Sequence, residues 1–321
     1  MNPNNVLYLV VPCYNEQEVL PETHRRLAQK LEALAAGGAI SAQCKMLFVD
    51  DGSRDATWQI IAGLAQSDPK VVGVKLSRNR GHQNALLAGL TVAVKHSDMT
   101  ISVDADLQDD LDAIDRMVEK YHAGAQIVYG VRSDRSTDTA FKRGTAQGFY
   151  KLMEAMGVET VYNHADYRLL SRRALEELLS FKEVNLFLRG MVPQVGFAAD
   201  FVSYKRGERF AGETKYPLKK MLALAVNGIT SFSVKPLQFL FWLGLACGFG
   251  GFAATVVQLV LAILGKAPST AAFVLSSLWL VGGILLTALG IVGEYVGKIY
   301  LETKARPRFV IETVAGRLEE N

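Results

Sequence analysis

The sequence predicts an α/β fold in which a mostly parallel β-sheet, covered by helices, is followed by a two-helix membrane hairpin. Short apolar runs alternate with helix-patterned stretches between residues 6 and 130. A polar cluster follows each of the first four runs. Beyond Lys235, charged residues almost disappear until Glu294, which marks a second kind of segment.

Five apolar or β-branched runs have the composition of buried strands. They lie at residues 6–13, 45–50, 71–76, 99–104 and 125–130. Helix-patterned stretches occupy the intervals at 16–36, 55–66, 82–96 and 110–123. Such alternation of strand and helix predicts right-handed crossovers and a parallel sheet.

The polar clusters that follow the first four runs read "PCYNE", "DDGSRD", "SRNRGH" and "DADLQDD". Ligands of parallel sheets bind beyond the carboxyl ends of the strands, so the four clusters are expected to form one site. A dinucleotide-dependent oxidoreductase is not favoured, because no G-x-G-x-x-G follows the first run. The G-x-G-x-x-A match that begins at Gly248 lies in the uncharged segment, where it indicates helix packing.

Within "DADLQDD", Asp104 and Asp106 predict a cation site. Residues two apart in extended chain point to the same side, and two neighbouring carboxylates repel unless a cation lies between them. Hard oxygen ligands favour Mg²⁺ or Mn²⁺. Gln108 offers a further oxygen from the same turn.

The other acidic residues of this region are interpreted as solvated side chains at the positive end of a helix dipole. They are Asp109, Asp110 and Asp112. His82 is interpreted as part of the "RNRGH" loop and not as a metal ligand, because no second histidine stands at ligand spacing.

Two uncharged runs follow the α/β part, at 236–265 and 267–293. Each exceeds the roughly 20 apolar residues that span a bilayer as a helix. We expect membrane helices at about 237–263 and 271–295. The alternative, two buried helices of a soluble core, is less favoured because neither run has a polar face.

The link between the two predicted spans is short, so both ends of the hairpin are expected on the same side of the membrane. Basic residues flank the hairpin on both sides, which favours a cytoplasmic location for both ends under the positive-inside rule; they are Lys219, Lys220, Lys235, Lys298, Lys304, Arg306 and Arg308. Residues 6–13 are too short for a signal peptide and lack a basic region before them. We therefore expect a multi-pass protein of the inner (plasma) membrane.

The expected organisation has four parts: a cytosolic domain at 1–216, an amphipathic juxtamembrane helix at 217–235, the hairpin at 236–296 and a cytosolic tail at 297–321. The net charge of +3 gives no reason to expect a nucleic-acid partner. Three widely spaced cysteines fit neither a disulfide framework nor a metal cluster.

The ordered motifs "VVPCYNE", "FVDDGSRD", "LSRNRGHQNALLAGL" and "VDADLQDD" resemble those of family 2 glycosyltransferases with the GT-A fold. Together with the hairpin, they are similar to the polyprenyl-phosphate branch, which includes bactoprenol glucosyltransferases and dolichol-phosphate mannose synthase. The resemblance continues through "HADYRLLSRR", "ERFAGETKY" and "GEYVGKIYLETKARPRF" and so covers nearly the whole chain. It implies a Rossmann-like GT-A domain at 1–216.

The resemblance implies a role for each matched position of the donor site. Nucleoside binding is implied for Pro12, Tyr14, Glu16, Val49 and Asp51. The D-x-D positions Asp104, Ala105 and Asp106 correspond to those that hold the metal and the diphosphate, and Gln108 corresponds to a position near the metal. Phosphate contacts are implied for Arg132, Arg209 and Lys215, in agreement with the bidentate fork that arginine offers a phosphate.

Asp166 in "ADYR" corresponds to the position usually proposed as the catalytic base. A phosphate monoester has a second pKa near 6, so a polyprenyl phosphate is already largely ionised at neutral pH and hardly needs a base. Two alternatives therefore stay open. Asp166 orients Arg168 or an acceptor oxygen, or it caps the helix that begins near Ser171.

The implied activity is inverting transfer of a sugar from a nucleotide-sugar, with UDP-glucose or a UDP-N-acetylhexosamine expected, to undecaprenyl or another polyprenyl phosphate. The product would be a lipid-linked sugar for cell-envelope glycans, made at the cytosolic face by a homo-oligomer, a tetramer by resemblance. A processive polysaccharide synthase is a rival, but the chain lacks the Q-x-x-R-W motif and has too few predicted spans. A non-catalytic nucleotide-sugar-binding scaffold is the other rival, and the intact D-x-D argues against it.

Overall fold

The computed structural model describes residues 4–133, 164–183, 187–205, 236–240 and 270–318, with scattered positions between 242 and 264. Two compact units are present: one comprises 1–150, 159–217 and 306–321, and the other comprises 151–158 and 218–305. Several predicted features lie outside the described residues. These are Arg209, Lys215, the juxtamembrane helix at 217–235 and most of the first predicted span.

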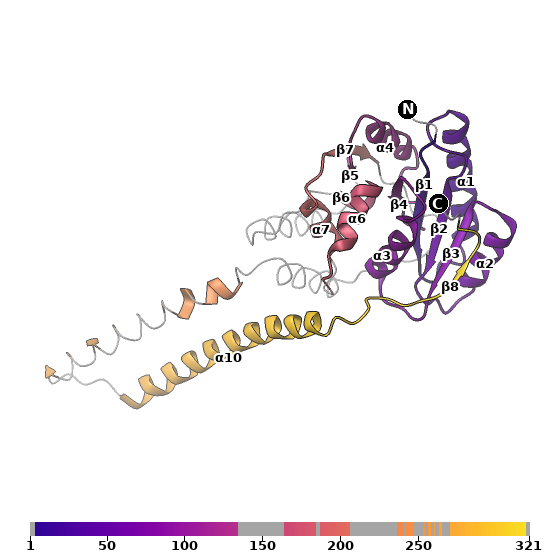
Figure 1. Cartoon of the computed structure of the whole chain (residues 1–321). Coiled ribbons are helices and arrows are strands. Elements are labelled where there is room, and N and C mark those ends of the chain that lie inside the picture. The colour runs from indigo at the N-terminus through magenta and orange to yellow at the C-terminus, as the bar shows by residue number, and fades with distance from the viewer. Residues whose placement is uncertain are drawn as a thin grey trace. The chain divides into compact units, whose positions relative to one another are not determined.

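The first unit contains an eight-stranded mixed sheet (Figure 1). Five strands confirm the five predicted runs: β1 (Leu7–Cys13), β2 (Lys45–Asp50), β3 (Val71–Leu76), β4 (Met99–Ser102) and β5 (Ile127–Arg132). Three further strands are β6 (His164–Ser171), β7 (Ala199–Tyr204) and β8 (Ile311–Ala315). Their order is β7-β5-β6-β4-β1-β2-β3-β8, and β4, β1, β2 and β3 run parallel. Four carboxyl ends therefore meet at one edge, as predicted.

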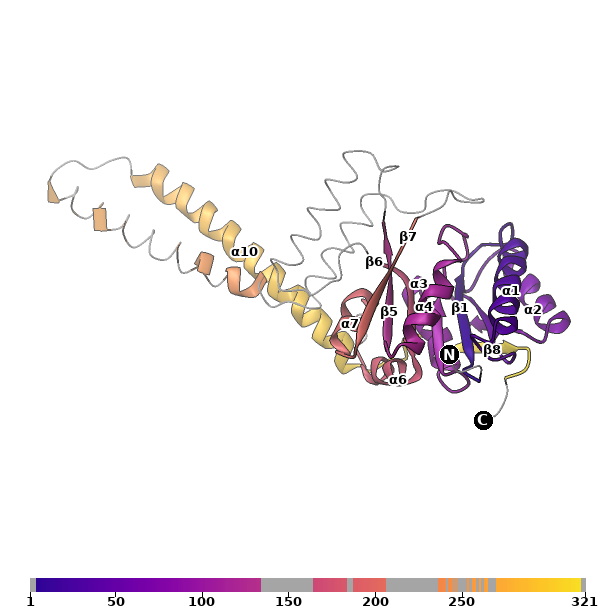
Figure 2. The ribbon, with the colours of Figure 1, turned by 90° about the horizontal axis from the view of Figure 1, so that it is seen from above.

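The sheet departs from the prediction on either side of these four strands. β6 lies between β4 and β5 and is antiparallel to both, while β7 is parallel to β5. Figure 2 labels β5, β6 and β7, which lie on the side of the sheet away from α1 and α2. Arg168 of β6 stands opposite Ser102 of β4. Strand β6 is not predicted from the sequence, because Asp166 and Arg168 interrupt the apolar pattern of the segment.

Helices cover both faces of the sheet. Side chains of α1 (Leu20–Ala36), α2 (Thr57–Ser67) and α4 (Ala113–His122) join one buried core with Leu9 and Phe48. On the opposite face, α3 (His82–Ala93) packs on Val10, Leu47 and Val49 through Gly89. Two shorter helices, α6 (Arg172–Ser180) and α7 (Leu188–Gln194), follow β6.

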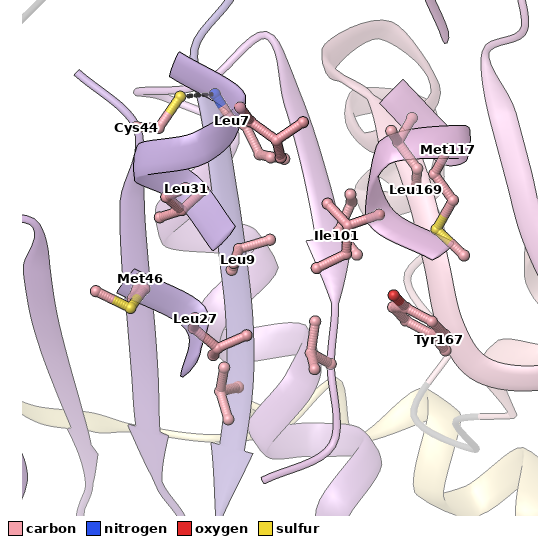
Figure 3. Close-up of a cluster of buried hydrophobic side chains, with 14 of the residues drawn as sticks. Leu7, Leu9, Leu27, Leu31, Cys44, Met46, Ile101, Met117, Tyr167 and Leu169 are labelled. Atoms are coloured by element: carbon pink, nitrogen blue, oxygen red, sulfur yellow. Dashed lines mark hydrogen bonds between the residues drawn. The ribbon is translucent and has the colours of Figure 1, made fainter. Parts of the chain in front are cut away.

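The main core forms because α1 buries leucines at helical spacing against alternate residues of the strands. Leu27 and Leu31, four positions apart, lie on one helix face beside Leu9 of β1 (Figure 3). Burying a leucine side chain contributes about 2 kcal/mol, so this cluster holds the strands that carry the polar ends in place. At its rim the Leu7 N–H donates to Cys44 Sγ at 3.0 Å.

The carboxyl-terminal residues return to the sheet. β8 pairs antiparallel with β3, with Val314 opposite Val74, although the two strands are far apart in the sequence (Figure 1). Lys45 Nζ donates to the Arg317 carbonyl at 2.6 Å. The sequence predicts only a tail at 297–321, because a strand of five residues is too short to be recognised from its pattern. The chain thus leaves the first unit before 218 and rejoins it after 305.

In the second unit, the second predicted span is helical. It lies within the 34-residue helix α10 (Thr270–Thr303), which exposes large apolar side chains such as Leu278, Leu285 and Leu289. None of the helices, as far as the structure describes them, combines the length and the apolar character that crossing a bilayer requires. The membrane hairpin stays a prediction.

A pair of helical glycines tests the packing of α3. A Cβ at Gly89 would lie 2.5 Å from Val10 Cγ1 and 2.7 Å from Val49 Cγ2. We expect Gly89→Ala to lower the free energy of unfolding by about 1–3 kcal/mol through overpacking. Gly63 of α2 meets nothing within 4 Å, so Gly63→Ala should stabilise the protein by up to about 1 kcal/mol. Denaturant unfolding of both variants measures the difference, and equal effects would contradict the close contact.

Candidate active site

The loops that follow β1 and β2 are joined by hydrogen bonds. The Asn15 N–H donates to Ser53 Oγ at 3.0 Å, and the Arg54 N–H donates to Asn15 Oδ1 at 2.9 Å. Glu16 is fixed by its N–H, which donates to Thr57 Oγ1 at 2.9 Å. Five hydrogen-bonded positions on two adjacent loops thus make one rigid wall of the site.

The residues predicted to hold a nucleoside lie along this wall. Pro12 of β1 and Val49 of β2 are direct neighbours across the strand pair. Tyr14 and Glu16 follow Pro12 and are half-buried, and Asp51 follows Val49. The structure therefore brings all five predicted nucleoside positions to the same part of the sheet edge.

Asp51 connects this wall to the loop after β3. Its two carboxylate oxygens accept from the backbone N–H groups of Arg80 at 2.7 Å and Gly81 at 2.8 Å. Burial raises the pKa of Asp51, and the two N–H bonds oppose that rise. Gly52 makes the close approach possible: its φ is +66°, and a Cβ there would lie 2.6 Å from the Asn79 nitrogen.

The predicted metal ligands lie in a tight turn at the end of β4. Between them, Ala105 is buried, and its carbonyl accepts from Thr23 Oγ1 at 2.8 Å. The Gln108 N–H donates to Asp106 Oδ1 at 3.2 Å, which closes the turn. The turn therefore holds Asp104, Asp106 and Gln108 close together.

This donor set fits a hard divalent cation bound with a diphosphate. Among the described residues, no group of three or more His, Cys, Asp or Glu side chains is arranged to hold a metal. Two carboxylates suffice where the metal keeps several waters and takes the rest of its ligands from substrate phosphates, as Mg²⁺ commonly does. Asp104, Asp106 and Gln108 would supply the protein's share of such a shell.

Asp109 differs from the prediction. It is only 5% exposed, and the Tyr204 hydroxyl donates to its Oδ1 at 2.7 Å. Burial and the nearby charge of Asp104 raise the pKa of Asp109 to about 7. The interpretation of Asp109 as a solvated acid at a helix start is therefore wrong, because a tyrosine from the distant strand β7 covers it.

The other acids of this region behave as predicted. Asp110 Oδ1 accepts from the Asp112 N–H at 3.0 Å, immediately before α4 begins at Ala113. Asp112 is exposed and pairs with Lys30 at 2.7 Å. Both residues therefore belong to the start of the helix and not to the site.

Arg132, predicted to contact phosphate, ends β5 and is half-buried. Its Nε donates to the Tyr204 hydroxyl at 3.4 Å, and the same hydroxyl donates to Asp109. A guanidinium is thereby linked through one tyrosine to the acidic turn after β4. Its predicted companions Arg209 and Lys215 lie outside the described residues.

Asp166 is held by two arginines. Its Oδ1 accepts from Arg168 Nη2 at 2.6 Å and from Arg189 Nε at 3.2 Å, while its Oδ2 accepts from Arg189 Nη2 at 3.1 Å. Burial alone would raise the pKa of Asp166, but the charges of Arg189 and Arg168 outweigh it and hold the pKa well below its usual range. A carboxylate this acidic is a weak proton acceptor at neutral pH.

These contacts bear on the alternatives for Asp166. Ser171 Oγ accepts from the Ala174 N–H at 3.1 Å and caps α6, so the capping role considered for Asp166 is wrong. The ion pair with Arg168 agrees with the orienting role.

Two residues near Asp166 have roles that their local sequence did not predict. Arg189, on α7, was not singled out, although an arginine inside the apolar stretch "LFLRGMV" needs an anionic partner when that stretch is buried. His82 was assigned no role beyond its loop. In the structure His82 Nε2 lies 3.7 Å from Asp104 Oδ1 and 3.8 Å from Asp166 Oδ2, between the acidic turn and the arginine pair.

Comparison with known proteins agrees with this geometry. The Glycosyl transferase family 2 domain matches residues 8–179. The chain is 51% identical over 307 residues to the uncharacterized glycosyltransferase YkoT of Bacillus subtilis (strain 168), covering 96% of this chain and 91% of that protein. The fold, the D-x-D turn and these matches define a glycosyltransferase.

Two further relatives carry more specific names. The prophage bactoprenol glucosyl transferase homolog of Escherichia coli (strain K12) is 40% identical over 308 residues, which is 95% of this chain and 98% of that protein. The bactoprenol glucosyl transferase of Shigella phage SfX is 40% identical over 307 residues, with the same two coverages. The chain belongs to glycosyl transferase family 2, as its motifs predicted.

Gly52 tests the contact between the loops. We expect Gly52→Ala to destabilise the protein by about 1–3 kcal/mol and to weaken nucleotide binding, because the added Cβ displaces the loop after β3. Gly38 is the matched control: its φ is +68°, but a Cβ there meets nothing within 4 Å. Thermal unfolding and UDP titration should show a larger effect at Gly52, and equal effects would mean that backbone strain alone is responsible.

Asp166→Asn tests the buried ion pairs. We expect a loss of about 3 kcal/mol in the free energy of unfolding at pH 7, because two guanidinium groups lose their counter-charge. The folded pKa of Asp166 lies below the unfolded value of about 3.9, so its stabilisation is complete above that value and is lost as pH falls toward the folded pKa.

The difference between wild type and Asp166→Asn should therefore be constant from about pH 8 to pH 5 and shrink below about pH 4. Asp200→Asn, which removes the more exposed pair with Lys120, is the control and should cost less than about 1 kcal/mol. Denaturant unfolding across this pH range measures both variants. Equal losses of unfolding free energy in the two variants at pH 7 would contradict a larger contribution from the ion pairs of Asp166.

Proposed function

We propose that the protein transfers a sugar from a nucleotide-sugar to a polyprenyl phosphate at the cytosolic face of the membrane, with inversion at the anomeric carbon. One observation carries this proposal: the similarity to proteins named bactoprenol glucosyl transferase runs past the family domain and covers 95% of the chain. UDP-glucose and a UDP-N-acetylhexosamine are the expected donors, and undecaprenyl phosphate is the expected acceptor.

On the donor side, the nucleoside would lie against the wall formed by the loops after β1 and β2. The diphosphate would then reach the turn after β4, where Asp104, Asp106 and Gln108 would hold Mg²⁺ or Mn²⁺. When bound, that ion neutralises charge that develops on the leaving diphosphate. Arg132 would add a bidentate donor for a phosphate oxygen.

In the reaction, an oxygen of the acceptor phosphate forms a bond to the anomeric carbon while the bond from that carbon to the nucleoside diphosphate breaks. A single in-line displacement inverts the configuration. The acceptor is already an anion at neutral pH, because its second pKa is about 6. Asp166 therefore need not take up a proton, which agrees with its low pKa beside Arg168 and Arg189.

The acceptor requires a location at the membrane. We propose that segment 236–296 forms a hairpin in the inner membrane, with the catalytic domain and both termini in the cytoplasm. The uncharged runs and the apolar side chains exposed along α10 support this. So does the return of β8 to the sheet, because a segment that leaves and rejoins one unit can cross a bilayer only an even number of times. Assembly into a homo-oligomer stays a prediction.

The test uses the purified full chain with undecaprenyl phosphate and UDP-glucose or UDP-N-acetylglucosamine. We expect UDP release that depends on the lipid, and a loss of at least about 100-fold in Asp104→Ala and Asp106→Ala. Asp115→Ala, which removes a carboxylate that pairs with Lys30 away from the site, is the control and should keep its activity. EDTA should abolish turnover.

Three results would count against the proposal. Full activity of either variant in EDTA would exclude the metal assignment. Binding of the nucleotide-sugar without consumption would favour the scaffold alternative. Addition of many sugars to each acceptor would favour a processive synthase, whereas a single sugar on the lipid is expected.

A further inference from the structure

In the part of the chain that the structure describes, two arginines surround Asp166. One carboxylate accepts hydrogen bonds from two guanidinium groups, those of Arg168 and Arg189. Arg168 is 2% exposed, and its Nη1 donates to the Leu188 carbonyl at 3.4 Å. Its guanidinium group is therefore buried and not accessible to a ligand. The Arg189 side chain is 33% exposed. Arg189 is therefore the cation of this cluster that a ligand can reach.

Arg189 is held in a fixed orientation. Its Nε and Nη2 bind the two oxygens of Asp166 as a fork, which sets the plane of the guanidinium group. The backbone of α7 is fixed as well, because the Leu188 N–H donates to Gln83 Oε1 at 3.0 Å. Because both the guanidinium group and the backbone that carries it are already fixed, Arg189 loses little conformational entropy when it binds an anion.

The cluster lies on the opposite side of β4 from the nucleoside wall. The strand order places β6 on one side of β4, and β1 and β2 on the other. Asp166 belongs to β6, whereas Tyr14 and Asp51 follow β1 and β2. Through His82, the cluster adjoins Asp104 in the acidic turn between the two.

This order has a consequence for an in-line displacement. The leaving group and the attacking group lie on opposite sides of the reacting carbon. If the nucleoside diphosphate extends from the turn after β4 toward β1 and β2, the attacking group approaches from the side of β6. Among the described residues on that side, Arg189 is reachable and is held by Asp166, whereas Arg132 at the end of β5 is linked through Tyr204 to the turn after β4.

We propose that Arg189 binds the phosphate monoester of the acceptor, with Asp166 as the residue that positions it. The lipid nature of that acceptor rests on the function proposed above, whereas the phosphate subsite follows from the cluster itself. Asp166 acts through Arg189 and does not accept a proton.

The kinetic test separates binding from chemistry. Replacing a charge-assisted phosphate contact weakens binding by about 10- to 100-fold. We expect Arg189→Ala to raise the KM for undecaprenyl phosphate by that factor and to leave UDP binding unchanged. Asp166→Asn should raise the same KM. A lower kcat with an unchanged KM in Asp166→Asn would instead indicate a base and would overturn the proposal.

UDP binding by each variant verifies that the fold is intact. If Arg189→Ala fails to bind UDP, Arg189→Lys decides, because it keeps the charge and loses the fork; its KM for the lipid should rise by about tenfold. Arg25→Ala, on the exposed side of α1, is the matched control and should behave as wild type. An unchanged KM in the Arg189 variant that binds UDP would overturn the proposal.

A binding measurement keeps the inference independent of turnover. Farnesyl phosphate and glycerol 3-phosphate are titrated calorimetrically into the UDP-bound protein in detergent. Binding of either that is lost in Arg189→Ala supports the subsite even if the wild type transfers no sugar to undecaprenyl phosphate, in which case only the proposed function fails. Selective binding of farnesyl phosphate identifies a lipid source, whereas no binding of either, or binding that Arg189→Ala retains, overturns the inference.

Discussion

The geometry of the site depends on the two backbone N–H bonds that the loop after β3 donates to Asp51. They hold Gly81, the residue directly before α3, and so set the position of His82 between the acidic turn and Asp166. One residue further on, Gln83 accepts from the Leu188 N–H and fixes the start of α7. A single carboxylate directly after β2, that of Asp51, is thus connected through Gly81, His82 and Gln83 to the arginine cluster beside β6.

The site is also electrostatically polarised along the sheet edge. The turn after β4 collects carboxylates, and burial, together with the nearby charge of Asp104, raises the pKa of Asp109 to about 7. Beside this turn, Arg168 of strand β6 and Arg189 of helix α7 surround Asp166. Such a field suits a reaction between two phosphate-bearing molecules, because one end attracts a cation and its diphosphate while the other attracts an anion directly.

The parts of the fold and site that could be predicted are those that the sequence shows over a few consecutive residues. The runs that became β1 to β5 are apolar enough to be recognised without knowledge of their partners, and Asp104 and Asp106 follow one of them directly. Strand β6 has no such apolar pattern, because Asp166 and Arg168 interrupt it; these two pair with each other and with Arg189 of a helix that comes later in the chain. The burial of Asp109 could not be predicted for the same reason, since Tyr204 is 95 positions away. Contacts of this range depend on strand order, which no local pattern specifies.

The return of β8 to the sheet bears on the order in which the protein can be built. The ion pair between Lys75 of β3 and Glu312 of β8 joins residues 237 positions apart. During synthesis the amino-terminal strands can assemble first, and the edge of β3 that pairs with β8 stays open until residues 311–315 leave the ribosome. An unpaired edge strand readily pairs with other chains. The time needed to synthesise and fold segment 218–305 therefore determines how long the edge of β3 stays open to pairing with other chains.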